Sequence, residues 1–376
     1  MNIFVAKETL AGESRVPVIP ATAEKLVKLG ASLSVESGMG ASLGIADEAY
    51  VKAGASIANR SEGQAAADIV LRLRKPSPSD LDGIKPGSIH VSYLDPFNEH
   101  ELIREMATRQ ISAVSLEMIP RSTIAQKMDV ISSQANLGGY VSVILAAERL
   151  SKILPMMTTP AGTIAPAKVF VIGVGVAGLQ AIATAKRLGA IVEAFDTRPV
   201  VEDQVKSLGA KFVKIDLGET GQTKDGYAKA LTEEQLAIQR QAMAKHCAGA
   251  DIVITTAQVF GRKAPVIVTA DMVAGMNPGS IVVDMAVETG GNVEGSALNQ
   301  EVDVKGVTII GLGNLPGRVA VHASQMYSSN LYNFIEHFWN KDEKSFALKR
   351  DDDIIKGCLI THGGEVVNET IKSLLG

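Results

Sequence analysis

The sequence predicts an α/β protein made of two doubly wound, parallel-sheet domains joined by long helices. Short β-branched and aliphatic runs alternate with amphipathic helical patterns along most of the 376 residues. The chain is 46% hydrophobic but only 4% aromatic, and it has 35 glycines, which suits strands and helices linked by tight turns rather than disorder. Its length allows two or three ordinary domains, each with its own core.

The N-terminal third of the chain contains the first strand series. Several of its apolar runs are nearly continuous in β-branched residues, as expected for parallel strands covered on both faces. The predicted strands are residues 3–6, 32–36, 68–73, 88–94 and 112–118. Helical patterns lie between some of them, at residues 21–30, 47–54 and 99–110. The first two end in Gly30 and Gly54, and glycine commonly follows the last turn of a helix.

A long helix, predicted from Ser132 to Ile153, crosses to the second series. The strands expected there are residues 168–173, 190–196, 211–216, 251–256, 280–285 and 307–311. A second long helix over 323–339 is expected to return to the first domain. The predicted domains are therefore residues 1–135 with 322–376, and residues 136–321.

One polar segment, residues 217–235, interrupts this alternation after the strand at 211–216. It contains glycines and a lone aromatic residue, Tyr227. A loop of this length inside a compact domain is commonly a mobile lid. Its composition fits a solvated connector equally well.

Composition also argues against several classes of function. The net charge is -4 with both signs interspersed, so no basic patch predicts nucleic-acid binding. No run approaches the roughly 18–20 apolar residues that span a bilayer, and direct membrane insertion is not expected. Cys247 and Cys358 are predicted to be unpaired thiols in a reducing compartment. The neighbouring His246 and Cys247 lack further ligands at metal-binding spacing, so no metal site is predicted.

The most informative motif is the glycine series of "VIGVGVAGLQ". Gly173, Gly175 and Gly178 have G-x-G-x-x-G spacing, follow an apolar strand and open an amphipathic helix. This context predicts a Rossmann-type dinucleotide site with the pyrophosphate at the helix N-terminus and the cofactor in the cleft between the domains. The predicted contacts are Gly173, Gly175, Val176, Ala177 and Gly178 in the turn, and Asp196, Thr197 and Arg198 after the next strand.

Asp196 indicates which dinucleotide binds. A carboxylate at the end of the second strand accepts hydrogen bonds from the adenosine ribose hydroxyls and repels a 2′-phosphate. Arg198 lies two residues further on and could neutralise part of that repulsion. NAD(H) is nevertheless favoured over NADP(H).

A second cluster, in "RSTIAQKMDVISSQ", comprises Arg121, Gln126, Asp129 and Ser132. These residues supply a fixed charge, an amide, a carboxylate and a hydroxyl rather than a group that moves a proton. Gln126 and Ser132 could hold the nicotinamide carboxamide or ribose, while Arg121 and Asp129 keep the segment rigid. The cluster could instead be a cap on the long helix, with Asp129 or Ser132 at the N-cap. The residues alone leave both interpretations open.

Together, "RSTIAQKMDVISSQANLGGY", "GVGVAGLQAIATAKRLGA", "GYAKALTEEQ", "APVIVTADMV", "GSIVVDMAVETGGN" and "GNLPGRVA" resemble the NAD(H)-binding alpha subunit (domain I) of proton-translocating nicotinamide nucleotide transhydrogenase. The resemblance covers essentially the whole chain. It implies hydride transfer between NAD(H) bound here and NADP(H) held on a partner component, coupled to proton translocation by a separate membrane-spanning component.

The resemblance also assigns residues and surroundings. It places Arg121, Gln126, Asp129 and Ser132 near the nicotinamide as the catalytic set, and Tyr227 on a mobile loop that closes over the nucleotide. It further implies a homodimer in the cytoplasm, peripheral to the inner face of the cell membrane through its partners. Because hydride passes directly between two nicotinamides, no acid-base residue is needed.

Alanine dehydrogenase is the alternative, because it shares this fold and the "AKET" segment followed by Arg15. That family handles its amino acid with a Lys and a His, where this chain has Arg74 and Asp95. Arginine stays protonated and cannot act as a base near neutral pH. A shifted alignment would bring Lys75 into the lysine position. Glu288 stands where the dehydrogenase has an Asp.

Overall fold

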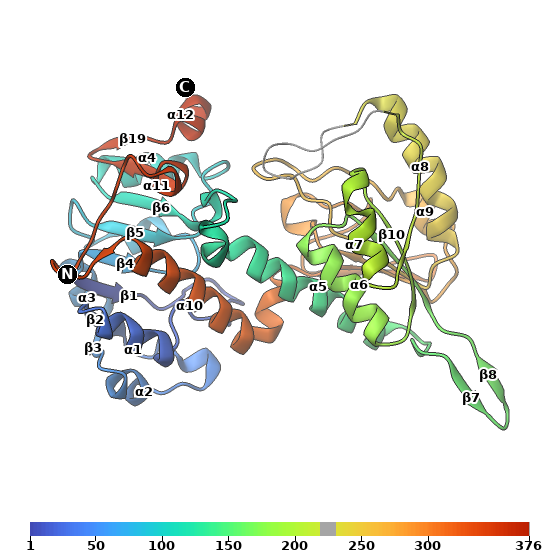
Figure 1. Ribbon diagram of the computed structural model, residues 1–376, viewed down its shortest axis with the longest axis horizontal. Helices are drawn as coiled ribbons and strands as arrows, with labels where there is room; N and C mark the ends of the chain where they lie inside the picture. Colours follow the sequence, from blue (N-terminus) through green and yellow to red (C-terminus); the bar gives the residue numbers. More distant parts are fainter. Residues whose placement is uncertain (219–230, 376) are drawn as a thin grey trace. The chain divides into compact units, whose positions relative to one another are not determined.

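The computed structural model describes residues 1–218 and 231–375. It divides the chain into two compact units (Figure 1). The N-terminal unit comprises residues 1–134 and 317–376, and the central unit comprises residues 135–316. Both contain a largely parallel sheet with helices on its two faces, which confirms the predicted α/β class.

The N-terminal unit is built on an eight-stranded sheet in the order β19-β18-β6-β5-β4-β1-β2-β3. Its six parallel strands are β1 (Asn2–Val5), β2 (Ser32–Glu36), β3 (Ser56–Ala58), β4 (Ile69–Leu71), β5 (Ile89–Ser92) and β6 (Ser112–Ser115). Two antiparallel strands extend the sheet beyond β6: β18 (Leu359–His362) and β19 (Glu365–Val366). The order of the parallel strands is that of a doubly wound nucleotide-binding sheet.

Seven helices cover this sheet: α1 (Pro20–Lys28), α2 (Asp47–Lys52), α3 (Arg60–Ala66), α4 (His100–Thr108), α10 (Ala320–His337), α11 (Asp353–Cys358) and α12 (Glu369–Leu375). Successive residues of β1 point to opposite faces, as in any strand. Ile3 packs with α1 and α10 residues such as Leu26 and Phe334. Phe4 packs on the other face with α4 residues such as Ile103. A short hairpin, β16 (Trp339–Asn340) and β17 (Ser345–Phe346), follows α10.

The central unit is built on a seven-stranded sheet in the order β11-β10-β9-β12-β13-β15-β14. Its strands are β9 (Lys168–Ile172), β10 (Ile191–Phe195), β11 (Lys211–Phe212), β12 (Ile252–Thr255), β13 (Ile281–Asp284), β14 (Gln300–Val304) and β15 (Val307–Gly311). The helices are α6 (Val176–Arg187), α7 (Glu202–Ser207), α8 (Glu233–Ala248) and α9 (Ala270–Ala274). Val169 and Val171 pack with α6, and Phe170 and Ile172 pack with α8 and α9.

Helix α5 (Val130–Arg149) carries the chain from the N-terminal unit into the central unit. It begins and ends earlier than the predicted span of Ser132 to Ile153. By length and composition alone it could cross a membrane, yet half of that stretch is buried. Gly139 allows α5 to pack directly on the central unit, because a Cβ there would lie 2.2 Å from the carbonyl oxygen of Ala177. These contacts are those of a core helix.

Three parts of the architecture differ from the sequence-based expectation. Strands β14, β18 and β19 are antiparallel edge strands that were not predicted. The predicted strand at 211–216 is reduced to β11. An unpredicted hairpin, β7 (Met157–Thr159) and β8 (Gly162–Ile164), projects from the central unit (Figure 1). Single 3-10 turns lie in the loops: η1 (Ala41–Leu43), η2 (Pro78–Leu81), η3 (Leu116–Met118), η4 (Ala125–Met128), η5 (Pro199–Val201), η6 (Val287–Thr289) and η7 (Leu315–Val319).

Candidate nucleotide-binding site

The glycine turn lies between β9 and α6, and each glycine has its own steric reason. Gly173 has φ +93°, and a Cβ there would lie 2.7 Å from Thr256 Oγ1. At Gly178 a Cβ would lie 2.0 Å from the carbonyl oxygen of Gly173, so only glycine lets the helix pack on the turn. A Cβ on Gly175, in contrast, would meet nothing within 4 Å. Space beside Gly175 is what a backbone needs if it is to approach a phosphate closely.

Helix α6 provides the positive end for an anion. Its N-cap is Gly175, at φ -86° and ψ -165°, which has no side chain to accept hydrogen bonds from the first turn. Val176 begins the helix and is 37% exposed. Free N–H groups at a helix N-terminus and the helix dipole together form an anion site. The predicted turn residues Val176 and Ala177 are therefore placed where a pyrophosphate would need them.

Asp196 follows β10 and is closely tied to the glycine turn. Its Oδ2 accepts the Val174 N–H at 2.7 Å, and its Oδ1 accepts the Arg198 N–H at 2.8 Å. The Arg198 guanidinium donates to both carboxylate oxygens, and this hydrogen bonding raises the pKa of Arg198. Arg198 also donates to the Val174 carbonyl oxygen at 3.1 Å. Arg198 thus turns toward Asp196 and the glycine turn, so its charge is largely balanced there.

Asp196→Ala is expected to weaken NADH binding and to narrow the difference in affinity between NADH and NADPH. The substitution removes the acceptor for the ribose hydroxyls and releases the Arg198 charge, which then favours a 2′-phosphate. Equilibrium dialysis with both nucleotides measures the two affinities. Equal affinity of the unmodified chain for NADH and NADPH would contradict the assignment of Asp196.

The second predicted cluster lies at the start of α5. Asp129 Oδ1 accepts the Ser132 N–H at 2.8 Å, and its Oδ2 accepts the Ser132 hydroxyl at 2.6 Å. This is the N-cap geometry, so Asp129 does cap the long helix. Because the Ser132 hydroxyl donates to Asp129, its oxygen remains available as an acceptor. Gln126 lies on η4 with its side chain exposed, and Arg121 is exposed just before it.

Tyr227 and most of the predicted lid lie outside the described residues. On the C-terminal side, the chain is described again from Leu231. Thr232 and Gln235 form a capping box at the start of α8. Gln235 also donates to the Leu217 carbonyl oxygen at 2.7 Å. The two ends of the segment are thus tied together, while the lid itself stays a prediction.

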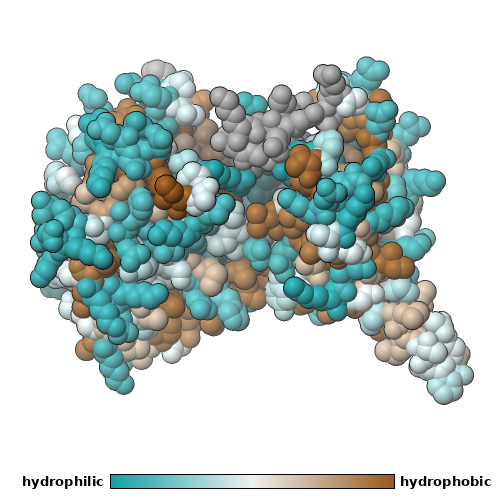
Figure 2. All heavy atoms as spheres, in the orientation of Figure 1, coloured by the Kyte–Doolittle hydropathy of each residue, from teal (hydrophilic) through white to brown (hydrophobic). Residues whose placement is uncertain are grey.

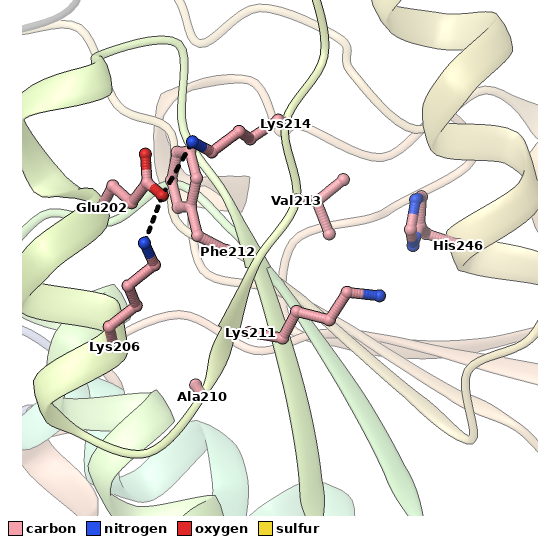
Figure 3. A pocket seen from close by; sticks show the side chains of 8 residues that line it. All are labelled: Glu202, Lys206, Ala210, Lys211, Phe212, Val213, Lys214 and His246. Atoms are coloured by element: carbon pink, nitrogen blue, oxygen red, sulfur yellow. Dashed lines mark ion pairs between the residues drawn. The ribbon is translucent and has the colours of Figure 1, made fainter.

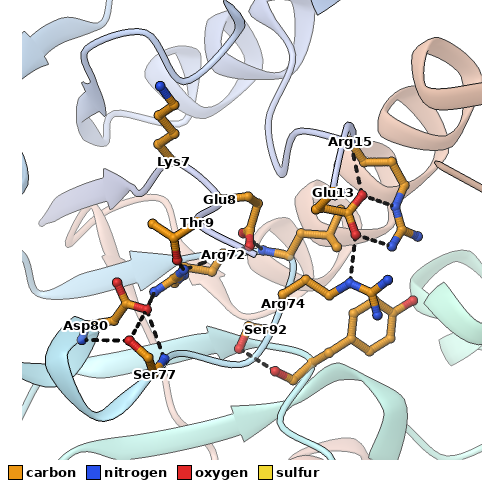
Figure 4. A network of polar contacts seen from close by, with 12 residues as sticks. Lys7, Glu8, Thr9, Glu13, Arg15, Arg72, Arg74, Ser77, Asp80 and Ser92 are labelled. Atoms are coloured by element: carbon orange, nitrogen blue, oxygen red, sulfur yellow. Dashed lines mark hydrogen bonds and ion pairs between the residues drawn. The ribbon is translucent and has the colours of Figure 1, made fainter. Parts of the chain in front are cut away.

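The position that carries the dehydrogenase lysine is occupied by an internal ion cluster (Figure 4). Arg74 Nε donates to Glu13 Oε2 at 2.7 Å, and Arg15 donates to both oxygens of the same carboxylate. Burial alone would raise the pKa of Glu13, but the hydrogen bonds and charge of Arg15, with Arg74, lower it to about 2. Arg15 also donates to Gln134 Oε1 at 2.8 Å. These groups hold fixed charges rather than exchangeable protons.

His90 and Asp95 do not supply the missing acid-base group. His90 is fully buried on β5, with Nε2 3.1 Å from Ser92 Oγ. Burial, with the nearby Arg72 charge, lowers the pKa of His90 to about 3, so the imidazole stays neutral. Asp95 lies after β5 in the left-handed region, at φ 52°, and pairs with Lys75 at 3.5 Å. Lys75 therefore forms an exposed ion pair with Asp95 and Glu99.

A separate hollow of about 650 Å³ lies beside β11 (Figure 3). It is lined by Glu202, Lys206, Ala210, Lys211, Phe212, Val213, Lys214 and His246. Glu202 pairs with Lys206 and Lys214, and Glu193 pairs with Lys211 and His246. The basic groups are thus balanced by neighbouring carboxylates. None of the glycine-turn residues lines this hollow.

Sequence reasoning missed Thr256, which follows β12. Its hydroxyl donates to the Gly173 carbonyl oxygen at 2.9 Å, and its N–H donates to the Ile172 carbonyl oxygen at 2.9 Å. Thr256 therefore joins the loop after β12 to the glycine turn. No motif marks this threonine, because the contact arises only when β9 and β12 pair.

A glycine turn at the carboxyl end of β9, in a sheet whose strand order reverses there, defines a Rossmann-type oxidoreductase of the nicotinamide nucleotide-binding class. The chain belongs to the alanine dehydrogenase/PNT family. The N-terminal domain of that family matches residues 4–138, and its C-terminal domain matches residues 142–369.

Two relatives within the family are similar along their whole length. The first of the chains that make up NAD(P) transhydrogenase subunit alpha in Rhodospirillum rubrum is 41% identical, with 99% of each chain covered. The crystal structure of a transhydrogenase from Sinorhizobium meliloti is 43% identical, with a TM-score of 0.88 over 98% of this chain and 100% of that chain. Alanine dehydrogenase of Bacillus subtilis is more distant, at 27% identity over 100% of this chain and 95% of the relative. These findings confirm the resemblance stated from the sequence.

Proposed function

We propose that this chain is the NAD(H)-binding alpha subunit of a proton-translocating transhydrogenase. It exchanges hydride with NADP(H) held on a partner component, and a separate membrane-spanning component couples this exchange to proton movement. The chain lies in the cytoplasm, at the inner face of the membrane, through those partners. The observation that carries the proposal is the full-length similarity to transhydrogenase alpha subunits, at 41% identity against 27% for alanine dehydrogenase.

The acid-base residues support the same choice. Reduction of an imino acid or oxo acid needs a proton donor near the substrate. Arg74 holds a permanent charge against Glu13, and His90 is buried and neutral. Direct transfer between two nicotinamides needs no proton from the protein. The residues present therefore fit transfer between nucleotides better than dehydrogenation of alanine.

The described residues also fit the cofactor. The nicotinamide, when bound, supplies or accepts the hydride. The free N–H groups at the start of α6 hold the pyrophosphate, and the open space beside Gly175 admits it. Asp196 accepts the ribose hydroxyls, which favours NAD(H) over NADP(H). Gln126 and Ser132 hold the nicotinamide end, with Asp129 fixing the Ser132 hydroxyl. Tyr227 anchors the lid.

A two-component assay tests the proposal. The purified chain is mixed with NADH and with a transhydrogenase partner domain loaded with NADP⁺, and NADPH formation is followed. Turnover is expected only when both components are present. Oxidation of NADH driven by pyruvate and ammonia, without any partner, would establish alanine dehydrogenase instead.

The hairpin supports the homodimer that the resemblance implies. Met156, Met157 and Ile164 are 66%, 45% and 50% exposed on a ribbon that includes both of its strands. Figure 2 shows a weakly polar surface along this ribbon. A two-stranded ribbon with exposed apolar residues is not expected to be stable without a partner. A second copy of the chain is the partner that every preparation contains.

Lysine at both Met157 and Ile164 is therefore expected to produce a monomer. Charged side chains are costly to bury, while their exposure on a free hairpin costs little. Size-exclusion chromatography with light scattering gives the mass of each species. Thr158→Lys, on the same ribbon, tests whether any added charge has this effect. A monomeric unmodified chain would contradict the homodimer.

A further inference from the structure

Asp284, the last residue of β13, is the centre of a buried polar cluster that the proposed function does not yet use. Its side chain is fully buried. Its oxygens accept the N–H groups of Ala286 at 3.0 Å, Asn292 at 3.0 Å and Val293 at 3.1 Å. Gly291 has φ +84°, and a Cβ there would lie 2.7 Å from Asp284 Oδ2. The carboxylate therefore fixes the whole turn that follows β13.

Asn292, held by that carboxylate, fixes a second loop. Its Oδ1 accepts the Ala257 N–H at 3.0 Å, and its Nδ2 donates to the Ala257 carbonyl oxygen at 2.8 Å. The remaining amide hydrogen goes to the Pro265 carbonyl oxygen at 2.8 Å. Asn292 is fully buried, and these bonds use its acceptor and both its donors. The amide thus holds both ends of the loop after β12.

This loop touches the glycine turn directly. Thr256, next to Ala257, donates to the Gly173 carbonyl oxygen. Gln258 reaches across to the Met285 carbonyl oxygen at 3.2 Å, which joins the loops after β12 and β13 on their exposed side. A continuous series of hydrogen bonds therefore runs from Asp284 through Asn292 and the loop after β12 to the glycine turn.

The location of the loop indicates which end of the nucleotide it faces. In a doubly wound sheet the dinucleotide lies across the carboxyl ends of the strands where the strand order reverses, and each half of the sheet takes one nucleotide. Here β9 and β12 flank that point. Asp196 and the adenosine ribose belong to the half that contains β10. The loop after β12 belongs to the other half, which takes the nicotinamide nucleotide.

The geometry points to Asn292 as a positioning residue for the nicotinamide end of the bound dinucleotide, acting through the loop 256–258 and itself held by Asp284. This inference rests on the proposed function for the identity of the nucleotide. Asparagine is required because the site needs one acceptor and two donors. An aspartate of the same shape would keep the Ala257 N–H bond but would face the Ala257 and Pro265 carbonyl oxygens without a donor.

Asn292→Asp tests this with two probes. NADH carries the nicotinamide, whereas ADP-ribose carries the same adenosine and pyrophosphate without it. The affinity for NADH is expected to fall by about tenfold or more, because two buried hydrogen bonds are replaced by repulsion. The affinity for ADP-ribose is expected to stay unchanged. Asn277→Asp, an exposed site in the same unit, is the matched control and should change neither affinity.

Gln258→Ala is the second variant, since this side chain is exposed and its loss leaves the buried cluster intact. It should lower the NADH affinity selectively, by a smaller factor. Equal losses for NADH and ADP-ribose in Asn292→Asp, or no selective loss in Gln258→Ala, would overturn the positioning role. The two binding measurements need no partner domain. A selective loss without turnover in the two-component assay would therefore refute the proposed function and not this inference.

Discussion

Gly175→Ala should lower the affinity for NADH by about 100-fold or more, because hydrogen bonds to a charged pyrophosphate contribute about 1.5–3 kcal/mol each. The free protein should be unaffected. Gly175 lies at φ -86°, which alanine adopts readily, and a Cβ there meets no atom of the chain within 4 Å. The added methyl group instead occupies the space that the phosphate needs. Fluorescence titration with NADH and urea unfolding measure the two quantities.

Gly178→Ala is the matched comparison, and it should fail in a different way. Its Cβ would lie 2.0 Å from the Gly173 carbonyl oxygen, a contact that only backbone movement relieves. The expected loss in free energy of unfolding is about 3 kcal/mol or more. If Gly175→Ala lost as much stability as Gly178→Ala, or if it bound NADH normally, the phosphate site would not lie at this turn.

Gln126→Ala should slow hydride transfer by about 100-fold while the affinity for NADH changes little, because misplacing a reacting group by about 1 Å carries a penalty of that size. Gln126 is exposed on η4, so its loss should not disturb the fold. The adenosine and pyrophosphate contacts in the central unit would remain. Rapid mixing with both nucleotide sites loaded measures the transfer step directly.

Thr123→Ala, an exposed neighbour, controls for local disturbance of the segment. Ser132→Ala should resemble Gln126→Ala in rate, but it should also loosen the start of α5, because the hydroxyl bonds to Asp129. Transfer at the normal rate in both Gln126→Ala and Ser132→Ala would leave the cluster with its capping role alone.

The parts of the fold that the sequence predicted are those with local signals. The parallel strands are short apolar runs, and helices α1 and α2 are followed by glycine at Gly30 and Gly54. The antiparallel strand β14 was missed because its sequence, QEVDV, places charged residues between its valines and lies at the sheet edge. Strand β18 pairs with β6 in the order Leu359 to Val114, and no periodicity in the sequence announces so distant a partner.

The site divides in the same way. The glycine turn and Asp196 lie on consecutive elements, so their spacing alone predicted them. The capping role of Asp129 could be read as one of two alternatives, because an N-cap is also a local feature. The contacts of Asn292 with Ala257 and of Glu13 with Arg74 join different loops, and only the folded chain brings them together. Such clusters satisfy buried groups that a linear pattern does not reveal.

The pairing of β18 with β6 has a consequence for synthesis of the chain. Residues 135–316 are contiguous, so the central unit has its whole sequence before the last strands of the other unit are made. The N-terminal unit has to wait for Leu359–His362, and until then β6 is an open sheet edge. Open edges invite pairing with other chains. A ribosome stalled or a message truncated before Leu359 would therefore release a chain with a complete glycine turn and an N-terminal half prone to aggregation.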